Sequence, residues 1–234
     1  MKVMEANSSI HLDSAKRVFA IEAQAVSALS EQIDNDFCKA IEHIIASKGR
    51  TIICGMGKSG IIGKKIAATF ASTGTPSFFM HPGEAYHGDL GMVTSEDTFI
   101  AISFSGETDE VVKLLPYLKD SGNFLVAITG NPASTLARAA DCHLNVSVKE
   151  EACPLQLAPT SSTTTTLAMG DALAVTLMKA RDFKPENFAR FHPGGDLGRR
   201  LMKVEELMGS GDRNPTITVD ASLLQAITIM SSAP

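Results

Sequence analysis

The stretch TIICGMGKSG, residues 51–60, decides the fold. Its first half is a short apolar run typical of a buried strand, and its second half is a glycine-rich turn that opens a helical pattern. Four further strand-like runs follow, at residues 77–80, 98–103, 124–129 and 143–148. Helical segments lie between them, at residues 60–72, around Glu84, and at 108–119 and 132–139. Short strands without clean alternation, separated by helices, predict a doubly wound α/β fold: a mainly parallel five-stranded sheet covered by helices on both faces.

Helices are also expected on either side of this alternating region. Asp13 is followed by apolar residues at helical spacing as far as Ile33, which predicts a helix capped by Asp13. A second helix is expected over residues 34–47, and a long one over 159–179, which begins with a run of Thr and Ser. We therefore expect an N-terminal helical segment at 12–48 and an α/β core at 50–203.

The composition changes near residue 208. Residues 209–215 are rich in Gly, Ser, Asp, Asn and Pro, which is typical of a linker, and residues 216–230 begin a new strand-and-helix pattern. Such a short piece cannot bury a core of its own. The sequence predicts one domain over 1–208, followed at 209–234 by a linker and the truncated start of a second domain.

Charge and composition exclude several functional classes. With 21 Lys and Arg against 26 Asp and Glu, the net charge of -5 and the absence of a basic block argue against nucleic-acid binding, while leaving room for a small anionic ligand. No membrane span or signal-peptide layout is visible, so we expect a cytoplasmic protein. The four cysteines form no Cys-x-x-Cys pair, which predicts free, buried thiols.

The glycine-rich turn at 55–60 has three interpretations. A nucleoside triphosphate loop would need glycine where Ile52 stands. The glycine spacing of a dinucleotide site is present, but no acid follows the second strand to hold a ribose hydroxyl. A ligand-free structural turn stays open. In each case the helix start offers backbone amides to a phosphate.

Two further helix starts carry hydroxyl groups. Ser103, Ser105 and Thr108 follow the third strand, and a Thr-Ser-Ser-Thr run at 160–163 opens the long helix. Hydroxyls and free amides at the carboxyl ends of neighbouring strands suit a phosphate monoester. The alternative is that they are ordinary helix caps.

Several blocks, in the same order, resemble the sugar isomerase (SIS) domain of bacterial D-arabinose-5-phosphate isomerases. The matching blocks are GMGKSG at 55–60, STGTPS at 72–77, HPGEA at 81–85, HGDLGM at 87–92, SGE at 105–107, EACP at 151–154, LAPTSS at 157–162 and HPGG at 192–195. The resemblance covers residues 12–208 and implies a flavodoxin-like, Rossmann-like sheet. In that family two CBS domains follow, and residues 204–208 and 221–230 resemble the entry to the first. Phe104 departs from the pattern, because a polar residue is common there.

The resemblance implies an enzyme that interconverts D-ribulose 5-phosphate and D-arabinose 5-phosphate through an enediolate, toward Kdo for lipopolysaccharide or capsule, without a cofactor. Its catalytic positions match Lys58, Glu110, Glu151 and His192. We expect Lys58 to stabilise the enediolate or hold the phosphate, and His192 to assist ring opening. Glu151 is our choice for the base that moves the proton, with Glu110 the next choice.

Substrate contacts are implied at further positions. His81 and His87 are expected to touch substrate, and His81 also matches a position that takes an inhibitory zinc. Other implied or expected contacts are Ser59, Gly74, Thr75, Ser103, Ser105, Thr108, Lys113 onward to Gly122, Ser147, Val148, Lys149 and Ser161. We also expect a homo-oligomer, a homotetramer, in which one subunit's histidine loop completes a neighbour's site.

Three rival functions stay open at this point. A non-catalytic SIS module would sense a sugar phosphate without turning it over, but the presence of both Glu110 and Glu151 speaks against it. A nicotinamide-dependent dehydrogenase is disfavoured by the missing ribose-binding acid. An isomerase of another phosphosugar is the third rival.

Overall fold

The computed structural model describes residues 2–191, 208 and 216–232, with the side chains of residues 2–9 left aside. The chain divides into two compact units, 1–183 and 184–234. The predicted domain boundary near 208 borders residues outside the described part and stays a prediction. The first unit holds a sheet of five parallel strands in the order β2-β1-β3-β4-β5. The strands are β1 (Thr51–Gly55), β2 (Ser77–Met80), β3 (Thr98–Ile102), β4 (Phe124–Thr129) and β5 (Cys142–Asn145).

This topology confirms the doubly wound α/β prediction. The chain passes from β1 outward to β2, returns to β3 on the other side of β1, and continues to β4 and β5. The direction of winding therefore reverses between β1 and β3. Ligands of such sheets bind outside the carboxyl ends of the strands at this reversal.

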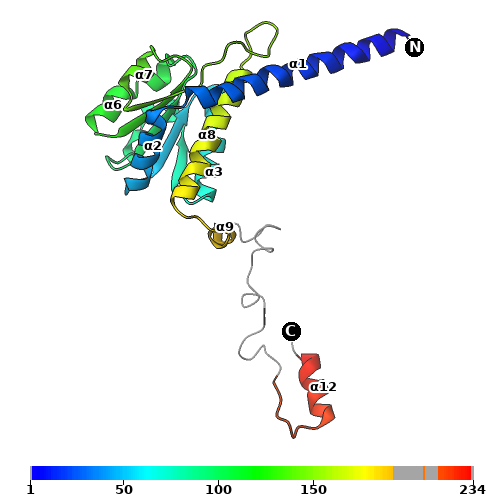
Figure 1. Ribbon diagram of the computed structural model, residues 1–234. Coiled ribbons are helices and arrows are strands. Elements are labelled where there is room, and N and C mark those ends of the chain that lie inside the picture. The colour runs from blue at the N-terminus through cyan, green and yellow to red at the C-terminus, as the bar shows by residue number, and fades with distance from the viewer. Residues whose placement is uncertain (1, 192–207, 209–215, 233–234) are drawn as a thin grey trace. The chain divides into compact units, whose positions relative to one another are not determined.

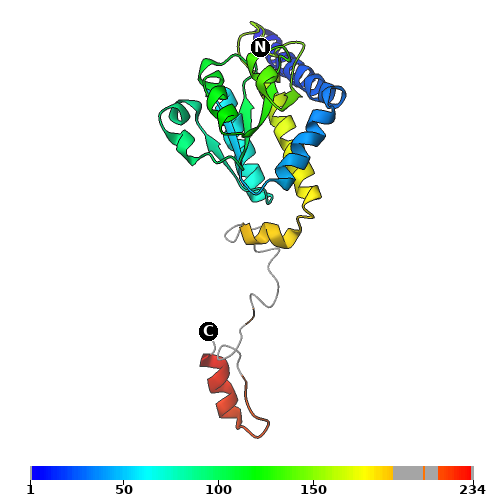
Figure 2. The ribbon, with the colours of Figure 1, turned by 90° about the vertical axis from the view of Figure 1, so that its left-hand side faces the viewer.

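Helices cover both faces of the sheet (Figures 1 and 2), and an apolar core lies between each face and its helices. Alternate residues of one strand serve opposite faces: Ile53 belongs to one core, while Ile52 and Cys54 belong to the other. The first core is closed by α2 (Asn35–Ala46), α3 (Gly57–Ser72), α8 (Ser161–Ala180) and the end of α1 (Lys2–Gln32). The second is closed by α4 (Pro82–Tyr86), α5 (Asp109–Val112), α6 (Leu115–Asp120) and α7 (Thr135–Ala139).

Small residues let α3 begin directly where β1 ends. A Cβ atom on Gly60 would lie 2.5 Å from the Gly55 carbonyl oxygen, and one on Gly63 would press on the Phe79 ring. Gly57, the first residue of α3, has φ +57°, a conformation that glycine adopts without strain. Gly55 and Gly60 are thus required by the close approach of helix to strand, and Gly57 by its backbone conformation.

The structure corrects three local predictions. The first helix continues N-terminally through Asp13, which is therefore no cap, because residues 2–12 contain no Gly or Pro to stop it. The single helix expected at 108–119 is two short ones, since Pro116 starts a new helix at α6. Cys38 is exposed and Cys153 is half-buried, so only Cys54 and Cys142 are the buried free thiols that we expected.

The end of the chain contributes fewer described elements. Residues 184–232 include α9 (Pro185–Phe191) and α12 (Leu223–Ser232). The first unit also contains a short 3₁₀ helix over Asp89–Met92. Among the described residues, no helix is both long and apolar enough to cross a membrane.

Candidate active site

A cavity of about 480 Å³ lies where the loops after β1, β3 and β5 meet the first turns of α8. It collects five of the residues that the sequence singled out: Lys58, Ser59, Ser105, Thr108 and Glu151. These residues come from segments up to about a hundred positions apart in the chain. The sheet assembles them, because the carboxyl ends of parallel strands share one edge.

The first wall is the start of α3. Its N-cap residue, Met56, has no side chain that accepts a hydrogen bond from the helix. The amides of the first turn are therefore left to an anion, and the helix dipole adds to their attraction. Lys58 and Ser59 lie in this turn and line the cavity, so a cation and a hydroxyl stand beside these amides.

The second wall is the loop from Ser103 to Thr108. The Ser103 and Thr108 hydroxyls lie 2.7 Å apart, and Ser103 Oγ also accepts from the Gly106 amide at 3.1 Å. Ser103 is only 2% exposed, so it fixes the orientation of Thr108 from behind and does not itself line the cavity. Thr108 precedes α5 without capping it, which contradicts the ordinary-cap alternative for this hydroxyl.

The third wall carries Glu151. One carboxylate oxygen, Oε2, accepts hydrogen bonds from the Thr160 amide at 2.7 Å, the Thr160 hydroxyl at 2.9 Å and the Ser162 amide at 3.2 Å. Burial raises the pKa of Glu151, but the hydrogen bonds from Ser162 and Thr160 outweigh it and leave the pKa below the ordinary value. Glu151 is therefore a carboxylate at neutral pH and can accept a proton.

Other predicted site residues lie outside this cavity. Glu110 is half-buried in α5, and the exposed Lys113 ends that helix, 3.7 Å from the Asp109 carboxylate. Gly74 and the buried Thr75 precede β2 and so lie at the opposite, amino-terminal edge of the sheet. None of these four residues lines the cavity that holds Glu151. His192 is outside the described residues.

The two histidines flank α4, after the carboxyl end of β2. His81 is its N-cap: the imidazole Nδ1 accepts from the Gly83 amide at 3.2 Å. His87, at the other end of α4, is exposed. A metal bound through Nε2 of a neutral imidazole requires the proton on Nδ1, which would break the contact with Gly83. Among the described residues, no group of three or more His, Cys, Asp or Glu side chains is placed to hold a metal ion.

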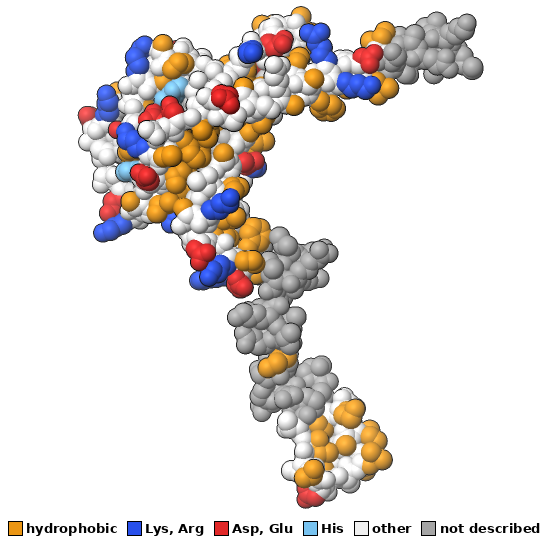
Figure 3. Space-filling model, in the orientation of Figure 1, with side chains coloured by type: hydrophobic (Ala, Val, Ile, Leu, Met, Phe, Trp, Pro, Cys, Tyr) orange, Lys and Arg blue, Asp and Glu red, His pale blue; other side chains and the backbone are white. Residues whose placement is uncertain are grey.

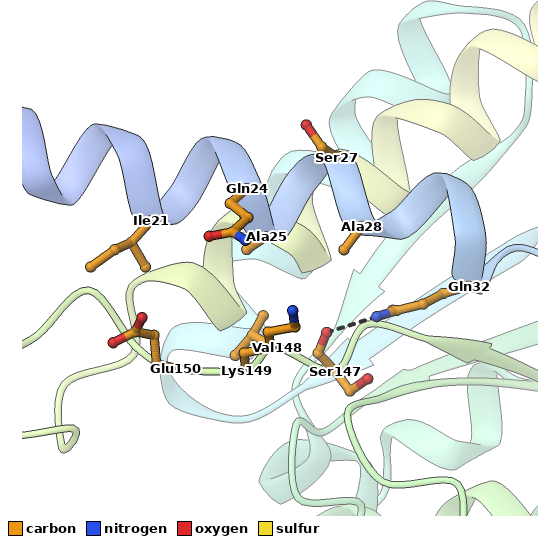
Figure 4. A pocket seen from close by; sticks show the side chains of 10 residues that line it. All are labelled: Ile21, Gln24, Ala25, Ser27, Ala28, Gln32, Ser147, Val148, Lys149 and Glu150. Carbon is orange, nitrogen blue, oxygen red and sulfur yellow. Dashed lines mark hydrogen bonds between the residues drawn. The ribbon is translucent and has the colours of Figure 1, made fainter.

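A second cavity, of about 450 Å³, lies beside α1 (Figure 4). Ser147, Val148 and Lys149 line it from the segment after β5. On the opposite side, α1 contributes mostly small and amide side chains, and Gln32 Nε2 donates to the Ser147 carbonyl oxygen at 3.2 Å. These three predicted sugar contacts therefore line a cavity other than the one that holds Glu151.

Sequence reasoning missed part of the lining. Ser162 and Thr163 line the main cavity. Ser161, the predicted substrate contact, is fully buried, and its hydroxyl has no hydrogen-bond partner in the described part of the chain. The Thr-Ser-Ser-Thr run at 160–163 indicates this segment, but the sequence does not show which of its side chains face the cavity. Phe104 also lines the cavity. Its ring packs against Gly130 so closely that a Cβ atom on that glycine would lie 2.6 Å from a ring carbon.

Comparison with known proteins shows the family to which the chain belongs. Residues 44–176 match the SIS domain family model. The chain is 55% identical over 229 residues to arabinose 5-phosphate isomerase KdsD of Pseudomonas aeruginosa, covering 96% of this chain and 70% of the relative. It is 57% identical over 215 residues to KdsD of Escherichia coli K12, covering 92% and 66%.

A solved structure, Escherichia coli CFT073 c3406 in complex with arabinose 5-phosphate, superposes with a TM-score of 0.76 at 44% identity, covering 80% of this chain and 98% of that one. The chain thus spans about two thirds of the length of the curated relatives it matches, and nearly all of this solved chain. With a matching family model over more than half of its length and relatives of this identity, the chain belongs to the SIS domain family, among the arabinose 5-phosphate isomerases.

Proposed function

We propose that this chain interconverts D-ribulose 5-phosphate and D-arabinose 5-phosphate. One observation carries the proposal: a carboxylate, a lysine and the hydroxyl-rich starts of helices line a single cavity at the reversal point of the sheet. An aldose–ketose isomerisation needs these three kinds of group, as base, as electrostatic partner of the enediolate and as phosphate anchor. The relatives named arabinose 5-phosphate isomerase support the identity of the sugar.

Each group has a role in the proposed reaction. The hydroxyls of Ser59, Ser105 and Thr108, with the amides of the first turn of α3, hold the phosphate. Glu151 takes a proton from C1 of the ketose, the C1–H electron pair forms the C1–C2 double bond of the enediolate, and the C2 oxygen takes up the negative charge. Lys58 stabilises that charge. Glu151 then returns its proton to C2, and the C1 oxygen becomes the aldehyde oxygen as its own proton moves to the C2 oxygen.

The remaining features of the reaction are part of the same proposal. No metal or cofactor is required by this chemistry, and His192 is assigned to ring opening. Substrate contact, not zinc binding, is the proposed role of His81, in keeping with its hydrogen bond to Gly83. We place the enzyme in the cytoplasm, which fits four free cysteines, and its product on the route to Kdo.

The proposed assembly is a homotetramer. Exposed apolar side chains along α1 support an interface there: Ile10 is 62%, Leu12 61% and Phe19 71% exposed. Figure 3 shows apolar side chains along this helix, which in Figure 1 extends away from the α/β body. Because Gly74, Thr75, His81 and Lys149 lie outside the main cavity of one chain, an assembly is also the proposed means of bringing them to substrate.

The test is turnover by the purified chain. Ribulose 5-phosphate is added after EDTA treatment, and formation of arabinose 5-phosphate is followed beside ribose 5-phosphate, glucose 6-phosphate and fructose 6-phosphate. We expect turnover of the arabinose and ribulose 5-phosphate pair alone, unchanged or raised by EDTA. Binding without turnover would favour a sensing module, turnover of another pair would change the substrate, and loss of activity in EDTA would establish a metal requirement.

A further inference from the structure

We propose that Thr160 is the residue that positions the Glu151 carboxylate for proton transfer. This inference rests on the proposed function and adds a residue to it. Thr160 is the N-cap of α8 and lies outside the set of side chains that line the main cavity. It acts on the reaction through Glu151, without touching substrate.

Thr160 engages the carboxylate twice. Its amide donates to Glu151 Oε2 at 2.7 Å and its hydroxyl donates to the same oxygen at 2.9 Å, with the Ser162 amide as a third donor at 3.2 Å. Three donors saturate one oxygen and fix the plane of the carboxylate. Within the described residues, no hydrogen bond occupies Oε1. Oε1 is therefore the carboxylate oxygen that is left to accept the substrate proton.

A second contact fixes the direction of the Thr160 hydroxyl. Its oxygen accepts from the Ala152 amide at 2.9 Å, and more weakly from the Cys153 amide at 3.4 Å. A hydroxyl has one proton to donate, and with amides on its lone pairs that proton points to Glu151. One side chain thus ties both the carboxylate and the backbone that follows it.

The usual reason for threonine at a helix start does not apply here. The Thr160 side chain makes no capping hydrogen bond to α8. The carboxylate of Glu151, nine residues earlier, accepts from the Thr160 and Ser162 amides in its place. The hydroxyl is consequently free to act on the carboxylate, which assigns it a role beyond helix capping.

The experiment compares Thr160→Val, Thr160→Ser and, as a matched control, Thr164→Val. Thr164 is on the same helix, and its hydroxyl bonds to Glu22 on α1, away from the cavity lining. For Thr160→Val we expect kcat to fall roughly 10- to 100-fold with KM nearly unchanged, because the base is misplaced while the phosphate contacts remain. Thr160→Ser keeps the hydroxyl and should stay within about threefold of the parent, as should Thr164→Val.

The pH profile separates positioning from general damage. Losing one donor to the carboxylate should move the acid limb of kcat/KM upward by about one pH unit in Thr160→Val. The titratable side chains that share a cavity with Glu151 in the described part are Lys58, Arg17, Glu150 and Cys153, and all stay the same in these variants. The shift therefore reports the lost hydroxyl.

Two kinetic outcomes overturn the inference. An unchanged acid limb with normal kcat would make Thr160 dispensable, and a raised KM with normal kcat would make it a substrate contact. If Thr160→Val does not fold, Thr160→Ala, which leaves room for water at the Ala152 amide, takes its place. If the parent chain proves inactive, the proposed function fails; a carbon-13 NMR titration of Glu151 in the parent and variants then still tests whether Thr160 lowers its pKa.

Discussion

Two cavities of nearly equal size, about 480 and 450 Å³, open on either side of the segment that follows β5. Residues 147–150 line the one beside α1, and Glu151 begins the wall of the other. Their chemistry differs. The α1 cavity is bounded by one long helix and one loop, and Lys149 and Glu150 both come from that loop, whereas the main cavity is bounded by three loops and two helix starts, with Lys58 and Glu151 on different segments.

The elements that supply the lining, and not the volume, distinguish the two cavities. The start of α3 directs amides without a capping side chain into the main cavity, while at the start of α8 the Thr160 and Ser162 amides hold Glu151 in its wall. The flank of α1 has all its amides within the helix and offers a ligand side chains alone.

The largest effect expected is that of Glu151→Gln, which tests whether the main cavity is catalytic. Glutamine can still accept hydrogen bonds from Thr160 and Ser162, but its amide cannot take a proton from carbon. We expect kcat to fall at least ~100-fold with the fold retained, measured by isomerisation of ribulose 5-phosphate.

Glu110→Gln belongs in the same experiment. Glu110 is half-buried in α5 and is absent from the lining of the main cavity. A greater loss from Glu110→Gln than from Glu151→Gln would assign the base to Glu110 and would place it outside the residues that line the main cavity.

A smaller effect is expected from exchanging one lysine in each cavity. Lys58→Met removes the cation beside the phosphate loops and should lower kcat/KM roughly 10- to 100-fold, the usual value of a hydrogen bond to a charged group. Lys149→Met removes an exposed charge from the α1 cavity and should cost about threefold or less. Equal losses in steady-state kinetics would unite the two cavities into one site, and no loss at all from Lys149→Met would remove Lys149 from the substrate contacts that the assembly is proposed to supply.

The smallest effect concerns stability in acid. Since the pKa of Glu151 is lowered in the folded chain, its carboxylate stabilises the fold above the ordinary glutamate pKa, and this contribution is lost as the pH falls through the lowered value. The parent should therefore melt a few degrees above Glu151→Gln at pH 7, and the gap should close below about pH 4. A gap that widens in acid would contradict the lowered pKa.

Much of the fold was predictable from short apolar runs. The predicted run at 124–129 coincides with β4, which is buried over nearly its whole length because helices cover both faces of the sheet. The run at 77–80 coincides with β2, although β2 is an edge strand in which only Met80 is buried. Helix ends were less predictable. Asp13 has the residue type of a cap but lies within α1, and the last predicted strand ends early because residues 146–148 leave the sheet.

For the site, residue types were predictable and partners were not. The glycine turn and Ser105 stand beside strand ends, so the sheet alone brings them together. The link from Glu151 to Thr160 depends on a loop in which Gln156 adopts φ +55° and clamps the Glu151 backbone, with Oε1 accepting from its amide and Nε2 donating to its carbonyl oxygen. No local sequence pattern specifies such a conformation in a residue other than glycine.

The place of β5 at the edge of the sheet has a consequence for how activity is lost. It pairs with β4 alone, whereas β1 and β3, which carry the phosphate loops, each have two neighbours. Edge elements open locally at lower free energy than central ones. If Glu151 is the base, fraying of β5 would loosen the segment that carries it beside an intact phosphate site, and we expect partial denaturation to abolish turnover before it abolishes binding.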